Sequence, residues 1–215
     1  MSSTELKGLI GISGFQKSGK DTSADYLVEY HGYQKLSLAL PIKEVCRELF
    51  GFSEEDLYGT SERRSTLYPD YLFSGKDPVD GSDLTLIEES DDRWWIRESD
   101  KEAFPRFITP RLALTSLGTD WGRRLCVDLW AEKLLGTLVG SSHQKWVISD
   151  VRFLNEMSLI QRRGGRVIRL LRGKLTTSHP SETELASVPL EDFDAVVDNR
   201  GTKEHLYTCL DNIVK

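Results

Sequence analysis

The chain has 215 residues, of which 39% are hydrophobic and 29% are charged, a composition that suits one sizeable globular core or a core with a small subdomain. Its net charge of −6 at pH 7 argues against a general DNA-coating function. The three cysteines are scattered and odd in number, which favours buried thiols in a reducing compartment over a disulfide framework or a zinc site.

We expect a cytoplasmic protein without a membrane segment. The first residues lack the apolar core of a signal peptide, and no apolar stretch approaches the roughly 20 residues that span a bilayer. The sequence contains no internal repeat and no low-complexity tract. These features favour a single folded domain over 1–215.

The first predicted element is a glycine-rich turn between a strand and a helix. Residues 9–13, Leu-Ile-Gly-Ile-Ser, predict a buried strand, and residues 20–31 have the apolar spacing of a helix. Between them, Gly-Phe-Gln-Lys-Ser-Gly-Lys matches the phosphate-binding pattern G-x-x-x-x-G-K, in which backbone N–H groups and the final lysine meet nucleotide phosphates. The predicted phosphate site consists of Gly14, Lys17, Ser18, Gly19, Lys20, Asp21 and Thr22. A surface turn rich in glycine and serine is the alternative.

Asp21 follows the loop lysine, where the pattern usually has a serine or threonine that ligates Mg²⁺. A carboxylate is also a hard oxygen ligand, so Asp21 can hold Mg²⁺ directly or through water. Its negative charge beside phosphates then needs a metal or basic residues to compensate it. The alternative is that Asp21 favours the N-terminus of the helix, and the sequence leaves both interpretations open.

Two short elements are predicted after the first helix. Residues 33–38 predict an extended piece, and Pro41 predicts the start of a second helix that ends at Gly51. The apolar residues spaced for one face of this helix are Ile42, Val45, Leu49 and Phe50.

Residues 52–108 differ from the rest of the chain. They are rich in Asp, Glu, Ser and Gly and lack sustained periodicity, with one strand indicated at 83–87. A long run without a clear pattern is often either functional or mobile. We interpret 52–108 as an arm inserted in the domain, which covers a substrate or pairs subunits.

A helical region is predicted from Thr109-Pro110, since threonine is a good N-cap and proline suits the first turn. We expect this helix to pause at Gly118 and to resume at Asp120. Apolar residues then recur every fourth position, and we interpret them as core rather than as a base-stacking surface: Trp121, Leu125, Leu129, Trp130, Leu134 and Leu138.

The last part of the chain alternates strands and helices. Strands are predicted at 146–150, 166–171 and 193–197, with helices at 153–162 and from Thr202 onward. Together with the first strand, this alternation predicts an α/β fold in which helices cover both faces of a parallel sheet. Ligands of such sheets bind at the carboxyl ends of the strands.

Two candidate catalytic residues follow one of these strands. Asp150 ends an apolar strand, a position from which a carboxylate can order Mg²⁺ or its waters. Arg152 can grip a phosphate with its planar guanidinium. The alternative is a surface ion pair at the strand end.

Further arginines are candidate phosphate ligands, because phosphoryl transfer needs cations that neutralise charge on the moving group. Arg111, Arg123 and Arg124 flank Gly118-Thr119-Asp120. We expect at least one of them to be functional, although each alone also fits a solvated helix residue. Arg172 ends a predicted strand and is either a phosphate contact or an exposed charge.

The remaining candidates lie in loops. Asn199 and Gly201, on the turn after the last strand, can border an adenine ring, and a plain Asn-x-Gly turn explains them equally well. His179 and Glu182 lie in a segment rich in Ser and Thr. A lone loop histidine without a second histidine does not indicate a metal site.

In their order along the chain, these motifs resemble the deoxynucleoside monophosphate kinases of tailed bacteriophages. The matching blocks are residues 13–25 around Ser18-Gly19-Lys20-Asp21, Leu40-Pro41-Ile42-Lys43-Glu44, Leu117-Gly118-Thr119-Asp120, Asp150-x-Arg152, the strand from Val167 to Arg172, His179-x-x-Glu182 and Asp198-Asn199-x-Gly201-Thr202. The predicted arm at 52–108 is not covered.

The resemblance implies ATP-dependent phosphorylation of deoxynucleoside monophosphates to diphosphates, with Mg²⁺, in a P-loop nucleotide-kinase fold and as a homodimer. It implies small-molecule nucleotides as partners, without membrane or specific nucleic-acid binding, and the host cytoplasm for a phage-encoded member. By matched position, Lys20 and its loop bind ATP phosphates, while Asp150 and Arg152 lie at the reaction centre. Arg111 falls in the family's arginine-bearing block, and Pro110 stands where the family has a second arginine.

The site hypothesis assigns each candidate one or more roles. The catalytic residues are Lys20, Arg123, Asp150 and Arg152; the metal ligands are Asp21 and Asp150; the ATP-binding residues are Gly14, Lys17, Ser18, Gly19, Lys20, Asp21, Thr22, Asn199 and Gly201; the acceptor-binding residues are Arg111, Asp120, Arg152 and Arg172.

Two alternative functions are open. Animal-type phosphomevalonate kinases share a Lys-Ser-Gly-Lys-Asp loop and three further blocks that match residues 36–42, 149–152 and 193–201, so another small phosphorylated metabolite is an alternative acceptor. The Leu-Gly-Thr-Asp block favours nucleotides. A nucleotide-binding switch such as a GTPase is the weaker alternative, because the chain has no Asn-Lys-x-Asp guanine motif.

Overall fold

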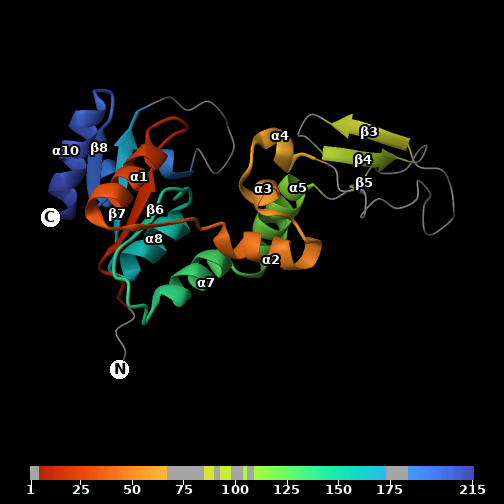
Figure 1. Ribbon diagram of the computed structural model, residues 1–215, viewed down its shortest axis with the longest axis horizontal. Helices are drawn as coiled ribbons and strands as arrows, with labels where there is room; N and C mark the ends of the chain where they lie inside the picture. The colour runs from red at the N-terminus through yellow and green to blue at the C-terminus, as the bar shows by residue number, and fades with distance from the viewer. Residues whose placement is uncertain (1–4, 67–84, 90–92, 98–103, 106–108, 173–183) are drawn as a thin grey trace. The chain divides into compact units, whose positions relative to one another are not determined.

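The computed structural model describes residues 5–66, 85–89, 93–97, 104–105, 109–172 and 184–215 (Figure 1). The chain divides into two compact units, one formed by 1–41 with 126–215 and the other by 42–125. The predicted arm, 52–108, falls within the second unit, and its role as a cover stays a prediction.

The first unit is built on a five-stranded sheet with the strand order β2-β6-β1-β7-β8. The strands are β1 (Leu9–Ser13), β2 (Gln34–Leu36), β6 (Trp146–Ile148), β7 (Arg166–Leu171) and β8 (Ala195–Asp198). All neighbouring strands pair in parallel, which confirms the predicted α/β fold. Every residue of the central strand β1 is buried, as expected for a strand covered on both faces.

Helices cover both faces of this sheet (Figure 1). On one face α1 (Lys20–His31) and α10 (Lys203–Val214) pack with Ile10 and Ile12. On the other face α7 (Leu129–Leu138) and α8 (Leu154–Arg162) pack with Leu9. Successive side chains of β1 point to opposite faces of the sheet, so this strand contributes to two separate apolar cores.

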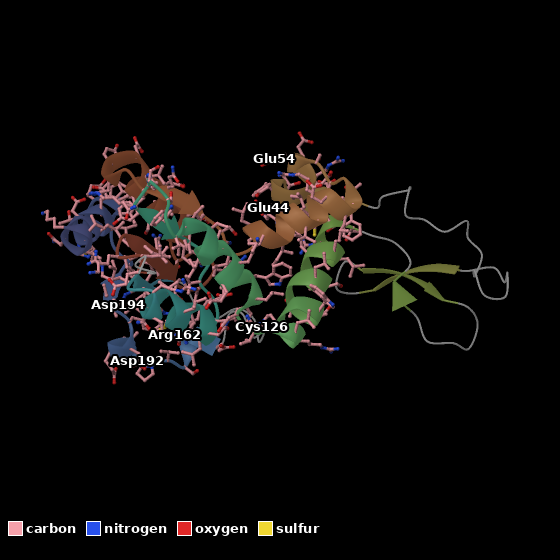
Figure 2. The ribbon with its side chains drawn as sticks, turned by 90° about the horizontal axis from the view of Figure 1, so that it is seen from below. Glu44, Glu54, Cys126, Arg162, Asp192 and Asp194 are labelled. Atoms are coloured by element: carbon pink, nitrogen blue, oxygen red, sulfur yellow. The ribbon has the colours of Figure 1, made fainter. Side chains whose placement is uncertain are left out.

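Two short 3₁₀ helices, Glu184–Ala186 and Leu190–Asp192, precede β8. After them, Asp194 (labelled in Figure 2) accepts hydrogen bonds from the backbone N of Val167 at 2.8 Å and from Gln161 Nε2 at 3.0 Å. These contacts tie the start of β8 to β7 and α8.

The second unit combines short helices with a small antiparallel sheet. Its elements are α2 (Leu40–Phe50), which begins in the first unit, α3 (Glu54–Tyr58), α4 (Ser61–Arg64), β3 (Thr85–Glu89), β4 (Arg93–Arg97), β5 (Phe104–Pro105), α5 (Pro110–Thr115), a π-helix (Ser116–Gly122) and α6 (Arg123–Leu125). The sheet has the order β3-β4-β5, so the strand indicated at 83–87 is present two residues later. Buried Phe52 and Leu57 anchor α3 in this unit.

The predicted pattern of buried residues between 109 and 138 is partly wrong. Helix α5 continues into a π-helix across Gly118 instead of pausing there, and the helical run breaks at 126–128 before α7. Trp121 and Leu125 are 53% and 64% exposed, so they are not core residues. The break changes the helical phase between α6 and α7. Of the predicted core residues, Leu134 and Leu138 on α7 are buried.

Helix α2 shows a smaller error of the same kind. Ile42 lies on its buried face as predicted, but Leu49 is 61% exposed and Cys46 is fully buried instead. The last turn of α2 thus carries its leucine into solvent. No helix within the described ranges has the length and apolar character to cross a bilayer.

Candidate active site

The loop between β1 and α1 is folded too tightly for side chains at two positions. A Cβ added at Gly14 would lie 2.4 Å from Ser18 Oγ, and one added at Gly19 would lie 2.4 Å from Asn199 Nδ2. Gly19 also has a φ of 99° and caps α1, and Lys17 adopts a left-handed φ of 62°. These conformations turn the loop back over the helix N-terminus, where backbone N–H groups attract anions.

Lys20 and Ser18 give this loop the polar groups of an anion site. Lys20 Nζ donates hydrogen bonds to the carbonyl oxygens of Gly14 at 2.7 Å and Phe15 at 2.8 Å, so its ammonium is held above the loop. The Ser18 hydroxyl is buried and has no hydrogen-bond partner within the described parts of the chain. A cation, an unpaired buried hydroxyl and a glycine cradle fit a polyphosphate.

Asn199 holds the phosphate loop through a buried hydrogen bond. Its side chain is 2% exposed, and its Nδ2 donates to the carbonyl oxygen of Ser18 at 2.8 Å. The contact that the structure shows for Asn199 is with the phosphate loop, and a contact with an adenine ring stays a prediction. Gly201 lies exposed on the following turn.

Asp21 stands at the start of α1, with its carboxylate held by two donors. Ser149 Oγ donates to Asp21 Oδ1 at 3.0 Å, and Lys35 Nζ lies 3.1 Å from the same oxygen. Desolvation opposes ionisation, but the hydrogen bonds with Lys35 and Ser149 outweigh it and lower the pKa of Asp21. Thr22, the next residue, is half-buried.

Asp150, just beyond β6, reaches the turn that follows the neighbouring strand β2. Its two carboxylate oxygens accept hydrogen bonds from Ser37 Oγ at 2.7 Å and from the backbone N of Leu38 at 3.2 Å. The structure thus brings the loop, Asp21 and Asp150 to the carboxyl edge of one sheet, as the sequence predicted. The alternative interpretation, an ion pair between Asp150 and Arg152, is not found: among the described residues, the partners of Asp150 are Ser37 and Leu38.

Arg152 and Arg172 are exposed at the same edge. The backbone N of Arg152 donates to Glu156 Oε2 at 2.8 Å, which starts α8. Its guanidinium makes no hydrogen bond or ion pair with any residue in the described ranges. Arg172 follows the end of β7 and is likewise exposed.

The other predicted substrate residues belong to the second unit. Arg111 on α5 donates to Ser61 Oγ, Asp120 is exposed within the π-helix, and Arg123 begins α6. All three lie on one helical run, and π-helical segments often occur at functional sites. His179 and Glu182 lie outside the described residues.

Sequence reasoning missed Lys35, Ser149 and Arg169. Arg169 is 5% exposed, donates to Ser13 Oγ at 2.9 Å and lies 5.0 Å from the centre of the Phe15 ring. An arginine within an apolar strand was the available signal for Arg169. The sequence carries no such signal for Lys35, because its contact with Asp21 depends on which helix packs against β2.

The carboxylates fit a magnesium ion that is shared with a nucleotide. Within the described ranges, no three His, Cys, Asp or Glu side chains form a metal-binding group. Mg²⁺ is commonly held by one or two carboxylates together with substrate phosphates. Asp21 and Asp150 are suitable oxygen donors at this edge.

Comparison with known proteins gives one consistent family. The model of the family "Deoxynucleotide monophosphate kinase" matches residues 8–77. The chain is 32% identical over 225 residues to a protein of Acanthamoeba polyphaga mimivirus named "Putative deoxynucleotide monophosphate kinase", with 95% of this chain and 96% of that protein covered. It is 25% identical over 253 residues to the deoxynucleotide monophosphate kinase of Enterobacteria phage T4, with 96% and 98% covered. It is 27% identical over 181 residues to the deoxynucleoside-5'-monophosphate kinase of Escherichia phage T5, with 71% of each chain covered.

Proposed function

The chain belongs to the deoxynucleotide monophosphate kinase family, and we propose that it transfers the γ-phosphate of ATP to a deoxynucleoside monophosphate. The products are ADP and the deoxynucleoside diphosphate. The observation that carries this proposal is the loop from Gly14 to Lys20, with its glycine cradle and its ammonium held over the loop carbonyls.

The chemistry of this reaction requires positioning more than proton removal. The attacking oxygen belongs to a phosphate whose second pKa is about 6, so it is largely ionised at neutral pH. The protein must then bring two anions together and neutralise the charge on the transferred group. Lys20 is proposed to bind the β- and γ-phosphates of ATP.

Asp21 and Asp150 are proposed to hold Mg²⁺ through their oxygens or through its waters. When bound, the ion would neutralise part of the charge on the phosphates of ATP. Ser37 and the backbone of Leu38 orient the Asp150 carboxylate. Ser149 does the same for Asp21.

Arginines are proposed to bind the acceptor. Arg152 is exposed at the carboxyl edge and has a guanidinium that is not engaged by the described residues, so it is suited to the acceptor phosphate. Arg172, Arg111 and Asp120 are proposed to complete acceptor binding, and Arg123 to stabilise the transferred phosphate. A homodimer in the host cytoplasm is part of the same proposal, and a monomer by analytical ultracentrifugation at assay concentrations would contradict the dimer.

A panel of acceptors tests the function. ADP release from ATP and Mg²⁺ would be measured with each deoxynucleoside monophosphate, each ribonucleoside monophosphate and phosphomevalonate. We expect turnover with at least one deoxynucleoside monophosphate and none with phosphomevalonate. Turnover with phosphomevalonate alone would replace the nucleotide acceptor with that metabolite.

A further inference from the structure

Lys35 connects the edge strand β2 to the first turns of α1. Its Nζ lies 3.1 Å from Asp21 Oδ1 and 2.9 Å from Asp25 Oδ1. Asp21 and Asp25 are four residues apart on the helix, where like charges face each other and repel. The lysine ammonium therefore bridges two carboxylates that would otherwise destabilise each other.

The contacts of Asp21 are concentrated on one of its oxygens. Oδ1 accepts a hydrogen bond from Ser149 Oγ at 3.0 Å and also faces Lys35. Oδ2 has no hydrogen bond to any residue within the described parts of the chain. A donor on β2 and a donor just beyond β6 thus fix the carboxylate by Oδ1 and leave Oδ2 available.

The position of Asp21 creates an electrostatic problem for ATP. The residue directly follows Lys20 and the phosphate loop, so its negative charge stands beside the site proposed for the phosphates. Mg²⁺ can offset this charge only when the metal is bound. A fixed cation within the protein offsets it at all times.

We infer that Lys35 is a positioning residue for nucleotide binding, which holds Asp21 by Oδ1 and compensates its charge so that ATP can bind before Mg²⁺ is in place. This inference rests on the proposed function and extends it to a residue outside the phosphate-loop motif. Lys35 acts through Asp21 and is not itself a phosphate ligand. Oδ2 is then the oxygen that Asp21 offers to a hydrated Mg²⁺.

The experiment measures ATP affinity by isothermal titration calorimetry, once in EDTA and once in excess Mg²⁺. We expect Lys35→Met to weaken ATP binding about tenfold in EDTA, the effect of losing one charge interaction, and less than about threefold in Mg²⁺. Lys35→Arg keeps the charge and should bind ATP as the wild type does. Asp25→Asn is the matched control, because it removes the other carboxylate partner of Lys35 and keeps the contact with Asp21, so it should not weaken ATP binding in either solution.

A double variant separates an action through Asp21 from a direct contact with ATP. In an Asp21→Asn background, Lys35→Met should change the affinity in EDTA less than about threefold. A tenfold loss that persists there would make Lys35 a direct phosphate ligand and overturn the inference. Equal losses in EDTA and Mg²⁺, or the same loss in Asp25→Asn, would reduce Lys35 to a structural residue. Absence of ATP binding by the wild type in both solutions would overturn the proposed function together with this inference.

Discussion

The ammonium of Lys20 is directed onto the loop that is proposed to bind ATP, and it rests there on two carbonyl oxygens. Such an arrangement costs little when the lysine is removed, because water can solvate the carbonyls of a half-buried loop. The charge itself has no substitute within the loop apart from Lys17. The chemistry should therefore depend on Lys20 much more than the fold does.

We predict that Lys20→Ala lowers kcat/KM at least about 100-fold, the scale of losing one electrostatic contact to a transition state. Circular dichroism and urea unfolding should show a folded protein. Lys133→Ala, an exposed lysine on α7, is the control and should behave as the wild type. A folded Lys20→Ala variant with normal turnover would contradict the assignment.

We predict that Asp150→Asn raises the Mg²⁺ concentration for half-maximal rate and lowers kcat, with a smaller effect on ATP affinity. The amide keeps the shape: its oxygen can still accept from the backbone N of Leu38, and its NH₂ group can donate to Ser37 Oγ in place of the present contact. It lacks the charge that attracts a cation. Magnesium titrations of the steady-state rate measure this effect. Asp192→Asn is the control, since Asp192 is exposed on the short 3₁₀ helix before β8 (labelled in Figure 2). Titration curves that overlay the wild type would make Asp150 a purely structural residue.

We predict that Arg152→Lys raises the KM for the acceptor monophosphate about tenfold or more, because lysine keeps the charge but loses the bidentate geometry of one charge-assisted pair. The KM for ATP should change little. Arg162→Lys (Arg162 is labelled in Figure 2) alters an exposed arginine that lies 3.6 Å from Asp128 and should change neither constant. An increase confined to the KM for ATP would assign Arg152 to the other nucleotide.

At the scale of elements, the phosphate loop depends on strands that are distant in sequence. The end of β8 supports it through Asn199, and Arg169 on β7 contacts Ser13 and Phe15 at its beginning. The loop is thus held by contacts that a local motif does not contain. The motif alone therefore predicted the loop, but the contact of Asn199 with Ser18 could not be predicted from it.

We predict that Asn199→Ala lowers the free energy of unfolding by about 1–3 kcal/mol, because the buried carbonyl of Ser18 loses its donor. The variant should also raise the KM for ATP more than it lowers kcat, since the loop loosens. Chemical denaturation and steady-state kinetics measure the two effects. Arg200→Ala, the exposed neighbour, should stay within about 0.5 kcal/mol of the wild type. Unchanged stability and unchanged KM in Asn199→Ala would contradict the supporting role.

Sequence periodicity predicted correctly those elements in which the buried residues are the ones that the spacing of apolar residues indicates. The strand at Leu9–Ser13 and the helix at Lys20–His31 agree with the structure to the residue, because a strand buried on both faces and a capped helix leave clear signals. The prediction that Trp121 is a core residue was wrong because the π-helix and the non-helical residues 126–128 change the helical phase between α5 and α7. The contact of Lys35 with Asp21 was not predictable, since it joins a strand and a helix through tertiary packing.

At the scale of the whole molecule, the sequence predicted an α/β sheet but not the division into two units. Residues 52–66, which the sequence assigned to the arm, contain α3 and α4 and the buried side chains of Phe52 and Leu57. A segment that can be removed without losing these buried side chains must therefore begin after residue 66. The sequence could not locate this boundary because short helices lack a measurable period.

We predict that replacing 67–108 with a short Gly/Ser linker leaves a folded protein that binds ATP but phosphorylates its acceptor poorly. The replacement removes the β3-β4-β5 sheet and keeps α3 and α5. A cover that excludes water is needed to favour transfer over hydrolysis, so the ratio of ADP release to acceptor phosphorylation should rise. A linker variant with normal acceptor kinetics and normal subunit association would contradict the interpretation of this segment as an arm that covers the acceptor or pairs subunits.

The transfer of a labelled phosphate tests the central claim most directly. The protein is incubated with ATP labelled at the γ-phosphate, Mg²⁺ and each deoxynucleoside monophosphate, and the products are separated by chromatography. The account predicts label in a deoxynucleoside diphosphate with the wild type, none without acceptor, and at least about 100-fold less with Lys20→Ala. Label found solely as free phosphate, or equal transfer by the wild type and Lys20→Ala, would contradict it.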